Sequence, residues 1–254
     1  MPLGRVAVVT GASSGIGEAT ARAFAKRGWR CVLLARREER LRALADELDG
    51  EFEVCDVADR DAVERVAASV RDRHPRISLL VNNAGIPAGG DYFDLEPEQI
   101  ERVIRVNYLG SVWCLRAFLA ALEAAAPSDV VNVVSVAGTV SSGGTSGPYA
   151  ASKHAQLAFS RSTATRLAPR GIRVHAINPG YVHTEGFPHL DRVSNPFVRR
   201  LVAQPEDVAE RIVRAVERGR GEVFVPRWYR PAAVVQALAP GLVRAAVGAH
   251  QSRR

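Results

Sequence analysis

The chain has 254 residues, of which 47% are hydrophobic and 24% charged, and its formal net charge is +7. This composition is typical of a soluble globular protein, and it excludes a disordered chain, a collagen and a small disulfide-stabilised scaffold. The three cysteines are odd in number and far apart, so the sequence predicts neither a disulfide framework nor a structural zinc site and favours a cytoplasmic location.

The positive charge lies in the last third of the chain, where residues 161–254 hold 16 Lys and Arg against 7 Asp and Glu. These arginines are scattered among acidic residues, without a basic run or interleaved aromatic residues, so we expect no nucleic-acid partner. The first apolar run, 6–9, is too short for a signal peptide, and no run of about 18 apolar residues occurs, so we expect no transmembrane segment.

Short apolar runs rich in β-branched residues alternate with amphipathic helical segments along the chain. The runs cover residues 6–9, 31–34, 52–54, 79–81, 130–134, 174–177 and 222–225. Gly28 and Gly50 are predicted to end the first two helices, and Asp59 to cap the third. Because the runs are fully apolar, they predict a parallel sheet covered by helices on both faces. We therefore expect one α/β domain over residues 1–254, a Rossmann-type doubly wound parallel sheet of about seven strands, with ligands beyond the carboxyl ends of the strands.

A glycine-rich turn follows the first strand, between Thr10 and Gly17. Its three glycines allow the backbone to turn sharply, approach a phosphate and pack the next helix against the sheet. The helix N-terminus then offers free N–H groups to a pyrophosphate. Such a turn also serves ordinary helix-to-strand packing, so both interpretations stay open for this motif alone. The cofactor-binding residues predicted here are Gly11, Ser13, Ser14, Gly15, Ile16 and Gly17.

The second strand ends at Ala35 and is followed by Arg36 and Arg37, with no carboxylate where one would bind the ribose 2′-hydroxyl of NAD. A guanidinium matches a phosphate in charge and geometry, so the pair predicts NADP(H) in preference to NAD(H). The alternative is that both arginines are only the solvated start of a helix. Asp56, after the third strand, is a candidate acceptor for the adenine amino group or a cap of the following turn.

Tyr149 and Lys153 lie four residues apart at the start of a predicted helix, which places the phenol and the ammonium on one face. Lys153 is one of only two lysines in a chain rich in arginine, which suggests a need for a compact ammonium group. To act as a base near neutral pH, a phenol must lose about three pKa units, or about 4 kcal/mol. One cation at about 4 Å supplies about that much where the effective dielectric constant is near 20.

Six motifs occur in one order: Thr10-Gly11-x-x-x-Gly15-Ile16-Gly17, Asn82-Asn83-Ala84-Gly85, Asn107, Ser135, Tyr149-x-x-x-Lys153 and Pro179-Gly180-x-Val182-x-Thr184. Each motif alone is permissive. Together, from residue 6 to about 225, they resemble the short-chain dehydrogenase/reductase family of the classical type.

The resemblance implies a role for each motif. Tyr149 would exchange a proton with the substrate oxygen, Ser135 would hydrogen-bond that oxygen, and Lys153 would bind the nicotinamide ribose and lower the pKa of the phenol. Asn107 would hold a water that links Lys153 to solvent. The remaining cofactor contacts would come from Asp56 and Val57 near the adenine, from Asn83, Ala84 and Gly85 under the adenosine ribose, and from Pro179, Gly180, Val182 and Thr184 at the carboxamide.

Two features depart from the pattern of the family. Ser135 and Tyr149 are one residue further apart than is usual, in a loop that holds other serines. Ser14 stands where several NADP-preferring relatives carry a basic residue, so phosphate recognition would rest mainly on Arg36, with a contribution from Ser13 or Arg37.

Residues 181–204 are irregular and apolar, and by resemblance they form the substrate lid, which favours a lipophilic carbonyl compound or alcohol as substrate. Residues 226–254 form a C-terminal extension with an apolar stripe flanked by arginines. We expect this extension to pack on the protein body or a neighbouring subunit rather than on a membrane surface. Family members commonly pair through the helices that follow Asn107 and Tyr149, so we expect a homodimer or homotetramer.

These observations predict an NADP-dependent oxidoreductase that acts on CH–OH groups, with carbonyl reduction as the favoured direction. The six histidines lack metal-ligand spacing, so we expect no metal. The alternative is a non-catalytic dinucleotide-binding regulator or scaffold, which would not require the phenol of Tyr149.

Overall fold

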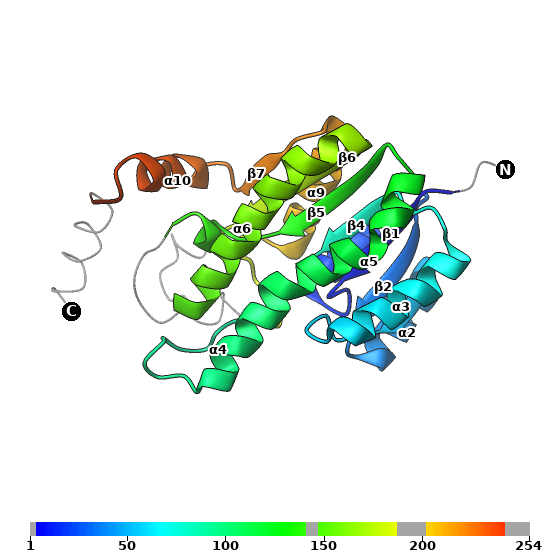
Figure 1. Cartoon of the computed structure of the whole chain (residues 1–254), viewed down its shortest axis with the longest axis horizontal. Helices are drawn as coiled ribbons and strands as arrows, with labels where there is room; N and C mark the ends of the chain where they lie inside the picture. Colours follow the sequence, from blue (N-terminus) through cyan, green and yellow to red (C-terminus); the bar gives the residue numbers. More distant parts are fainter. Residues whose placement is uncertain (1–3, 141–146, 187–201, 242–254) are drawn as a thin grey trace.

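A computed structural model describes residues 4–140, 147–186 and 202–241 of the chain (Figure 1). Seven parallel strands form one sheet in the order β3-β2-β1-β4-β5-β6-β7. The strands are β1 (Val6–Thr10), β2 (Arg30–Ala35), β3 (Glu51–Val54), β4 (Leu79–Asn82), β5 (Ser128–Val133), β6 (Ile172–Pro179) and β7 (Glu222–Val225). The predicted fold class, a doubly wound α/β sheet, is confirmed.

Side chains of the central strands alternate between two apolar layers, as a pleated strand requires. In β1, Ala7 and Val9 pack on one side, and Val6 and Val8 pack on the other. The helices α1 (Gly15–Ala25), α2 (Glu38–Leu48) and α9 (Pro205–Arg218) cover the first side, and α3 (Arg60–Arg73), α5 (Gly110–Ala124) and α6 (Gly147–Leu167) cover the second. Figure 1 shows α3, α5 and α6 side by side in front of the sheet. Burial on both faces explains why the strand sequences are continuously apolar.

Two further helices stand outside these layers. Helix α4 (Pro97–Ile104) runs into a π-helical turn at Arg105–Leu109, which continues directly into α5. Helix α10 (Tyr229–Leu238) follows β7 and extends away from the sheet in Figure 1. Within the described ranges, no helix has the length and apolar character needed to cross a membrane.

The ends of the first helices are largely those expected from the sequence. Asp59 accepts hydrogen bonds from the backbone N–H groups of Asp61 and Ala62, so the predicted cap of α3 is confirmed. Helix α2 ends on Asp49, which is in the left-handed conformation with φ of 49°, rather than on Gly50. Gly50 is required for a different reason, because a Cβ atom there would lie 2.8 Å from the carbonyl oxygen of Cys31 in the adjacent strand.

Parts of two predicted segments lie outside the described residues. They are residues 187–201 of the predicted substrate lid and residues 242–254 of the C-terminal extension. The serine-containing loop at 141–146, between Ser135 and Tyr149, also lies outside them.

Candidate active site

A cleft of about 1090 Å³ opens at the carboxyl ends of the strands. Every residue that the sequence analysis placed in contact with cofactor or substrate lines this cleft, with the exception of Gly17 and Asn107. Residues from the first to the last third of the chain therefore converge on one site, at the position that parallel α/β sheets use for ligands.

The glycine-rich turn between β1 and α1 has the backbone conformation that its sequence predicts. Gly11 and Gly15 have φ values of +64° and +59°, which residues other than glycine rarely adopt. Gly17 is needed for close approach, because a Cβ atom there would lie 2.4 Å from the carbonyl oxygen of Gly11 and 2.5 Å from Nδ2 of Asn83. The N-cap residue Ser14 makes no side-chain cap hydrogen bond. The first amide groups of α1 thus receive no side-chain acceptor from their cap residue.

Thr10 and Asn83 hold this turn against the end of β4. The Thr10 hydroxyl donates to the carbonyl of Val81 (3.2 Å) and accepts from the backbone N–H groups of Asn83 (3.0 Å) and Ala84 (3.1 Å). The Asn83 side chain in turn donates to the carbonyl oxygens of Thr10 and Gly11. The Asn83 motif therefore fixes the shape of the turn.

Ser135 and Tyr149 meet in the middle of the cleft. Ser135 follows β5 directly, and Tyr149 lies in the first turn of α6. The hydroxyl of Ser135 is hydrogen-bonded to the phenol of Tyr149, so the longer spacing between them in sequence does not separate them. Burial raises the pKa of Tyr149 to about 12, and the hydrogen bond to Ser135 offsets only part of this increase.

Lys153 lies one turn further along α6, with its nitrogen 5.9 Å from the centre of the Tyr149 ring. The ammonium group is buried and donates to the carbonyl oxygen of Val133 and to Oε1 of Gln156, both at 2.9 Å. Burial lowers its pKa to about 7. In the polypeptide alone, the pKa of Tyr149 is therefore raised rather than lowered. Burial is the largest contribution to the pKa shift of both residues.

Asn107 lies in the π-helical turn between α4 and α5 and is fully buried. Its amide accepts from the backbone N–H of Ile86 (2.8 Å) and donates to the carbonyl of the same residue (3.0 Å). The Nδ2 atom also lies 3.0 Å from the hydroxyl of Ser152, which donates to the carbonyl oxygen of Tyr149. π-Helical turns are frequent at functional sites. Here the turn aims Asn107 at the backbone that carries Tyr149.

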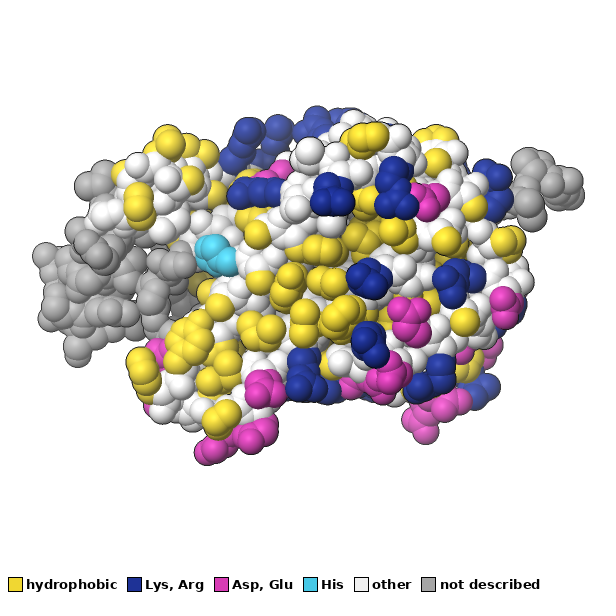
Figure 2. Space-filling model, viewed as in Figure 1, with side chains coloured by type: hydrophobic (Ala, Val, Ile, Leu, Met, Phe, Trp, Pro, Cys, Tyr) yellow, Lys and Arg dark blue, Asp and Glu magenta, His cyan; other side chains and the backbone are white. Residues whose placement is uncertain are grey.

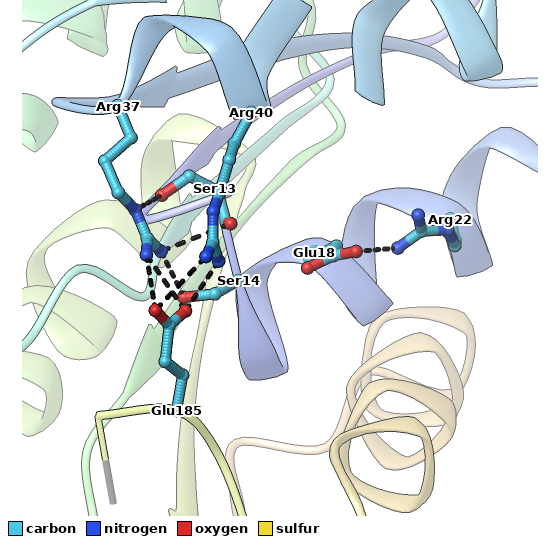
Figure 3. Close-up of polar contacts among 7 residues, drawn as sticks. All are labelled: Ser13, Ser14, Glu18, Arg22, Arg37, Arg40 and Glu185. Atoms are coloured by element: carbon cyan, nitrogen blue, oxygen red, sulfur yellow. Dashed lines mark hydrogen bonds and ion pairs between the residues drawn. The ribbon is translucent and has the colours of Figure 1, made fainter. Parts of the chain in front are cut away.

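At the other end of the cleft, Arg37 rather than Arg36 contacts the glycine-rich turn (Figure 3). Its guanidinium donates to the hydroxyls of Ser13 (3.1 Å) and Ser14 (2.7 Å), whereas the side chain of Arg36 is exposed. Asp56 accepts from the backbone N–H of Ala58 and from Arg102 of α4, so it caps the turn after β3, which was one of its two predicted roles. These partners outweigh burial and hold the pKa of Asp56 below its usual value.

The chain after β6 forms the opposite wall of the cleft. A Cβ atom on Gly15 would lie 2.9 Å from the Thr184 methyl carbon, so this segment reaches the glycine-rich turn. A Cβ atom on Gly180 would lie 2.0 Å from the ring of Tyr229, which therefore packs closely against the backbone after Pro179. Tyr229 is stacked on Trp228, with ring centres 3.8 Å apart.

The family profile described as short chain dehydrogenase matches residues 5–192. The chain belongs to the short chain dehydrogenase family. It is 36% identical over 219 residues to oxidoreductase UcpA of Salmonella typhimurium, covering 84% of this chain and 80% of that protein. Its structure is similar to that of an actinorhodin polyketide ketoreductase with NADPH (31% identity, TM-score 0.79, 87% of this chain and 95% of that chain). A short chain dehydrogenase/reductase from Burkholderia phymatum in complex with NAD is also similar (26% identity, TM-score 0.82, 95% of both chains).

As a short chain dehydrogenase, the protein is an oxidoreductase, and this part of the sequence-based prediction is confirmed. The two solved relatives carry different nicotinamide cofactors, NADPH in one and NAD in the other. Within the ranges that the structure covers, no group of three or more His, Cys, Asp or Glu residues has the geometry of a metal site.

The sequence analysis of this short chain dehydrogenase missed several buried polar residues behind the site. Gln156 accepts from Lys153 and donates to the hydroxyl of Ser111 (2.8 Å), and all three side chains are buried. Ser152 is also fully buried and joins Asn107 to the first turn of α6. Gln156 lies three residues after Lys153, and Ser152 lies three residues after Tyr149, so helical spacing places each beside a predicted catalytic residue and is the signal that could have identified them.

Proposed function

We propose that this short chain dehydrogenase transfers a hydride between NADP(H) and a lipophilic carbonyl compound or alcohol, with reduction as the working direction. The observation that carries the proposal is the convergence of Tyr149, Ser135 and Lys153 beside the glycine-rich turn, in one cleft. The proposal is tested by assaying a panel of ketones, aldehydes and alcohols with both cofactors, following the absorbance of the nicotinamide.

The residues that line the cleft suit a dinucleotide. The glycine-rich turn brings backbone N–H groups to the start of α1, where a pyrophosphate is favoured by hydrogen bonding and by the helix dipole. Gly85 lies against Asn107 and Lys153, since a Cβ atom there would be in ordinary contact with both, at 3.4 and 3.6 Å. Thr184 and the backbone after Pro179 would bind the carboxamide of the nicotinamide, whose ring supplies the hydride.

Tyr149 is proposed as the group that gives a proton to the substrate oxygen. A pKa of about 12 keeps its phenol protonated at neutral pH, which suits the acid required for reduction and not the base required for oxidation. Ser135 would hydrogen-bond the same oxygen and orient it toward the phenol. Lys153, whose pKa of about 7 lies near the operating pH, is suited to exchange protons and would replace the one that Tyr149 loses. Asn107 would hold the start of α6 in position.

We expect Arg37→Ala to weaken the binding of NADPH at least ten-fold, because a charge-assisted hydrogen bond to a phosphate is worth about 1.5–3 kcal/mol. NADH, which lacks the 2′-phosphate, should change by less than about two-fold. Isothermal titration with each cofactor measures both values. Arg42→Ala is the matched control, because Arg42 pairs with Glu38 on the outer surface of α2. Equal losses for the two cofactors would refute a role of Arg37 in NADP selection.

The lipophilic substrate is proposed from the aromatic wall of the cleft. Tyr181, Trp228 and Tyr229 line its open end, and Trp228 is 49% exposed although it is stacked on Tyr229. An exposed aromatic pair at a cleft is suited to stack against an apolar or aromatic ligand.

We expect Trp228→Ala to raise the KM for a bicyclic aromatic ketone by about ten-fold, because an aromatic contact contributes about 1.5 kcal/mol at most beyond its buried area. The KM for a small aliphatic ketone and the affinity for NADPH should change by less than about two-fold. Steady-state kinetics of both ketones provide the measurement, with Trp228→Phe as the control that keeps a stacking ring. A parallel loss for the small ketone would contradict a substrate-binding role of Trp228.

A homodimer or homotetramer is proposed from the surface over α5 and α6. Apolar side chains gather over these helices in the space-filling view (Figure 2). Trp113 and Leu119 of α5 and Phe159 of α6 are only partly buried there. An apolar surface of this kind on a soluble enzyme is typical of a contact between subunits.

A further inference from the structure

Glu185, on the chain after β6, lines the cleft and faces Arg37 and Arg40 at the start of α2 (Figure 3). Its carboxylate accepts hydrogen bonds from two guanidinium groups at once. Arg37 donates at 3.0 and 2.9 Å, and Arg40 at 2.6 and 3.3 Å. Neither Glu185 nor Arg40 was identified by the sequence analysis, because Glu185 lies 145 residues from Arg40 in the chain.

Arg37 and Arg40 form a built site for an anion. They lie three residues apart at the start of α2, with both guanidiniums directed at one point, and the hydroxyls of Ser13 and Ser14 also accept hydrogen bonds from Arg37. The two arginines hold the pKa of Glu185 below its usual value, so its carboxylate is ionised at neutral pH. A carboxylate and a phosphate monoester present similar oxygen geometry to a guanidinium fork.

We propose that the carboxylate of Glu185 occupies the position of the ribose 2′-phosphate of NADP(H) between Arg37 and Arg40, and thereby competes with that phosphate. This inference rests on the proposed use of NADP(H). It assigns Arg40 to the phosphate site and Glu185 to the control of cofactor affinity.

The competition is expected to be moderate and selective. All three side chains are between 40% and 52% exposed, so the ion pairs contribute little to stability and exchange readily. A phosphate monoester carries a charge of about −1.5 to −2 at neutral pH and displaces a single carboxylate charge. The ribose hydroxyl of NAD(H) is neutral and would leave the Glu185 pair intact. Glu185 therefore lowers the affinity for the 2′-phosphate without acting on the rest of the dinucleotide.

The test uses two nucleotide probes that differ only in this group, adenosine 2′,5′-diphosphate and adenosine 5′-monophosphate, bound to the full chain and measured by isothermal titration. Glu185→Gln is expected to raise the affinity for the diphosphate by about five-fold, which corresponds to the contribution of one or two exposed ion pairs. The affinity for the monophosphate should change by less than about two-fold. Arg40→Ala is expected to weaken the diphosphate and to leave the monophosphate unchanged.

Glu18→Gln is the matched control. Glu18 also pairs with an arginine, Arg22, but it lies on α1 and points away from Arg37 (Figure 3). The Glu18→Gln substitution removes the same charge as Glu185→Gln. It should leave the ratio of the affinities for the diphosphate and the monophosphate unchanged. A change in that ratio equal to the one in Glu185→Gln would show a general charge effect and overturn the proposal.

Two further results would overturn the inference. In one, Glu185→Gln leaves the diphosphate affinity unchanged. In the other, Glu185→Gln lowers the affinity for the monophosphate, which would make Glu185 a hydrogen-bond acceptor for the ribose. The proposed preference for NADP(H) is tested separately. It would be wrong if the wild-type protein bound adenosine 2′,5′-diphosphate and adenosine 5′-monophosphate with equal affinity. A preference for the diphosphate that then appeared in Glu185→Gln would still support competition by Glu185.

Discussion

Replacement of Tyr149 by phenylalanine is expected to lower the turnover number for carbonyl reduction by about 10³-fold, within the range of general acid–base catalysis. The substitution removes the hydroxyl that contacts Ser135 and keeps the ring, which lies in the first turn of α6. The affinity for NADPH should therefore change by no more than a few-fold. Turnover is measured with the best ketone of the panel, and the affinity by titration of cofactor fluorescence.

Tyr108→Phe is the matched control for this experiment. Tyr108 lies in the π-helical turn and packs edge-to-face on Phe159, with ring centres 6.2 Å apart, outside the lining of the cleft. Its loss of a hydroxyl should leave turnover unchanged. If Tyr149→Phe retained wild-type turnover, Tyr149 would not be the proton donor. If the wild-type chain turned over no substrate of the panel, the alternative of a non-catalytic dinucleotide-binding protein would gain support.

Substitution of Gly17 by alanine is expected to destabilise the fold by about 2–3 kcal/mol, the cost of overpacking a rigid site. In an ordinary helix, alanine would instead be more favourable than glycine by about 1 kcal/mol. The steric effect outweighs this gain because the added Cβ atom would lie 2.4 Å from the backbone oxygen of Gly11 and 2.5 Å from Asn83. Relief of this contact must distort the glycine-rich turn, so NADPH affinity should also fall at least ten-fold.

Thermal unfolding should show the loss as a decrease in Tm of about 5–10 °C for a chain of this size. Gly221→Ala serves as the control, because a Cβ atom at Gly221 would have no atom within 4 Å. Its Tm and NADPH affinity should match those of the wild type. An unchanged Tm for Gly17→Ala would mean that the turn is less tightly packed than the structure indicates.

Sequence reasoning predicted the sheet and the glycine-rich turn because both depend on local patterns. Continuous apolar runs identify strands that are buried on both faces, such as Val6–Thr10. The glycines of the turn follow from backbone conformation and close approach, which hold wherever such a turn occurs. Asp49 shows the limit of this reasoning, because aspartate can also adopt the left-handed conformation and so end α2 one residue before the glycine.

The interactions that the sequence could not predict join residues far apart in the chain or depend on burial. The pairing of Arg37 with Glu185 spans 148 residues, and no local pattern indicates it. Spacing places Lys153 on the same helix face as Tyr149, but it does not reveal that Val133 and Gln156 bind the ammonium. It also does not reveal how deeply both groups are buried, and this burial raises the pKa of Tyr149 and lowers the pKa of Lys153.

The central claim is that Tyr149 protonates a carbonyl oxygen while hydride reaches the adjacent carbon in the same cleft. The most direct measurement uses NADPH deuterated at the transferred position of C4 and follows the label into the alcohol by mass spectrometry. The account predicts deuterium on the carbinol carbon of a lipophilic alcohol with the wild-type chain, and almost none in the same time with Tyr149→Phe. Undiminished label in the Tyr149→Phe product, or tight NADPH binding with no label transferred to any carbonyl compound of the panel, would contradict it.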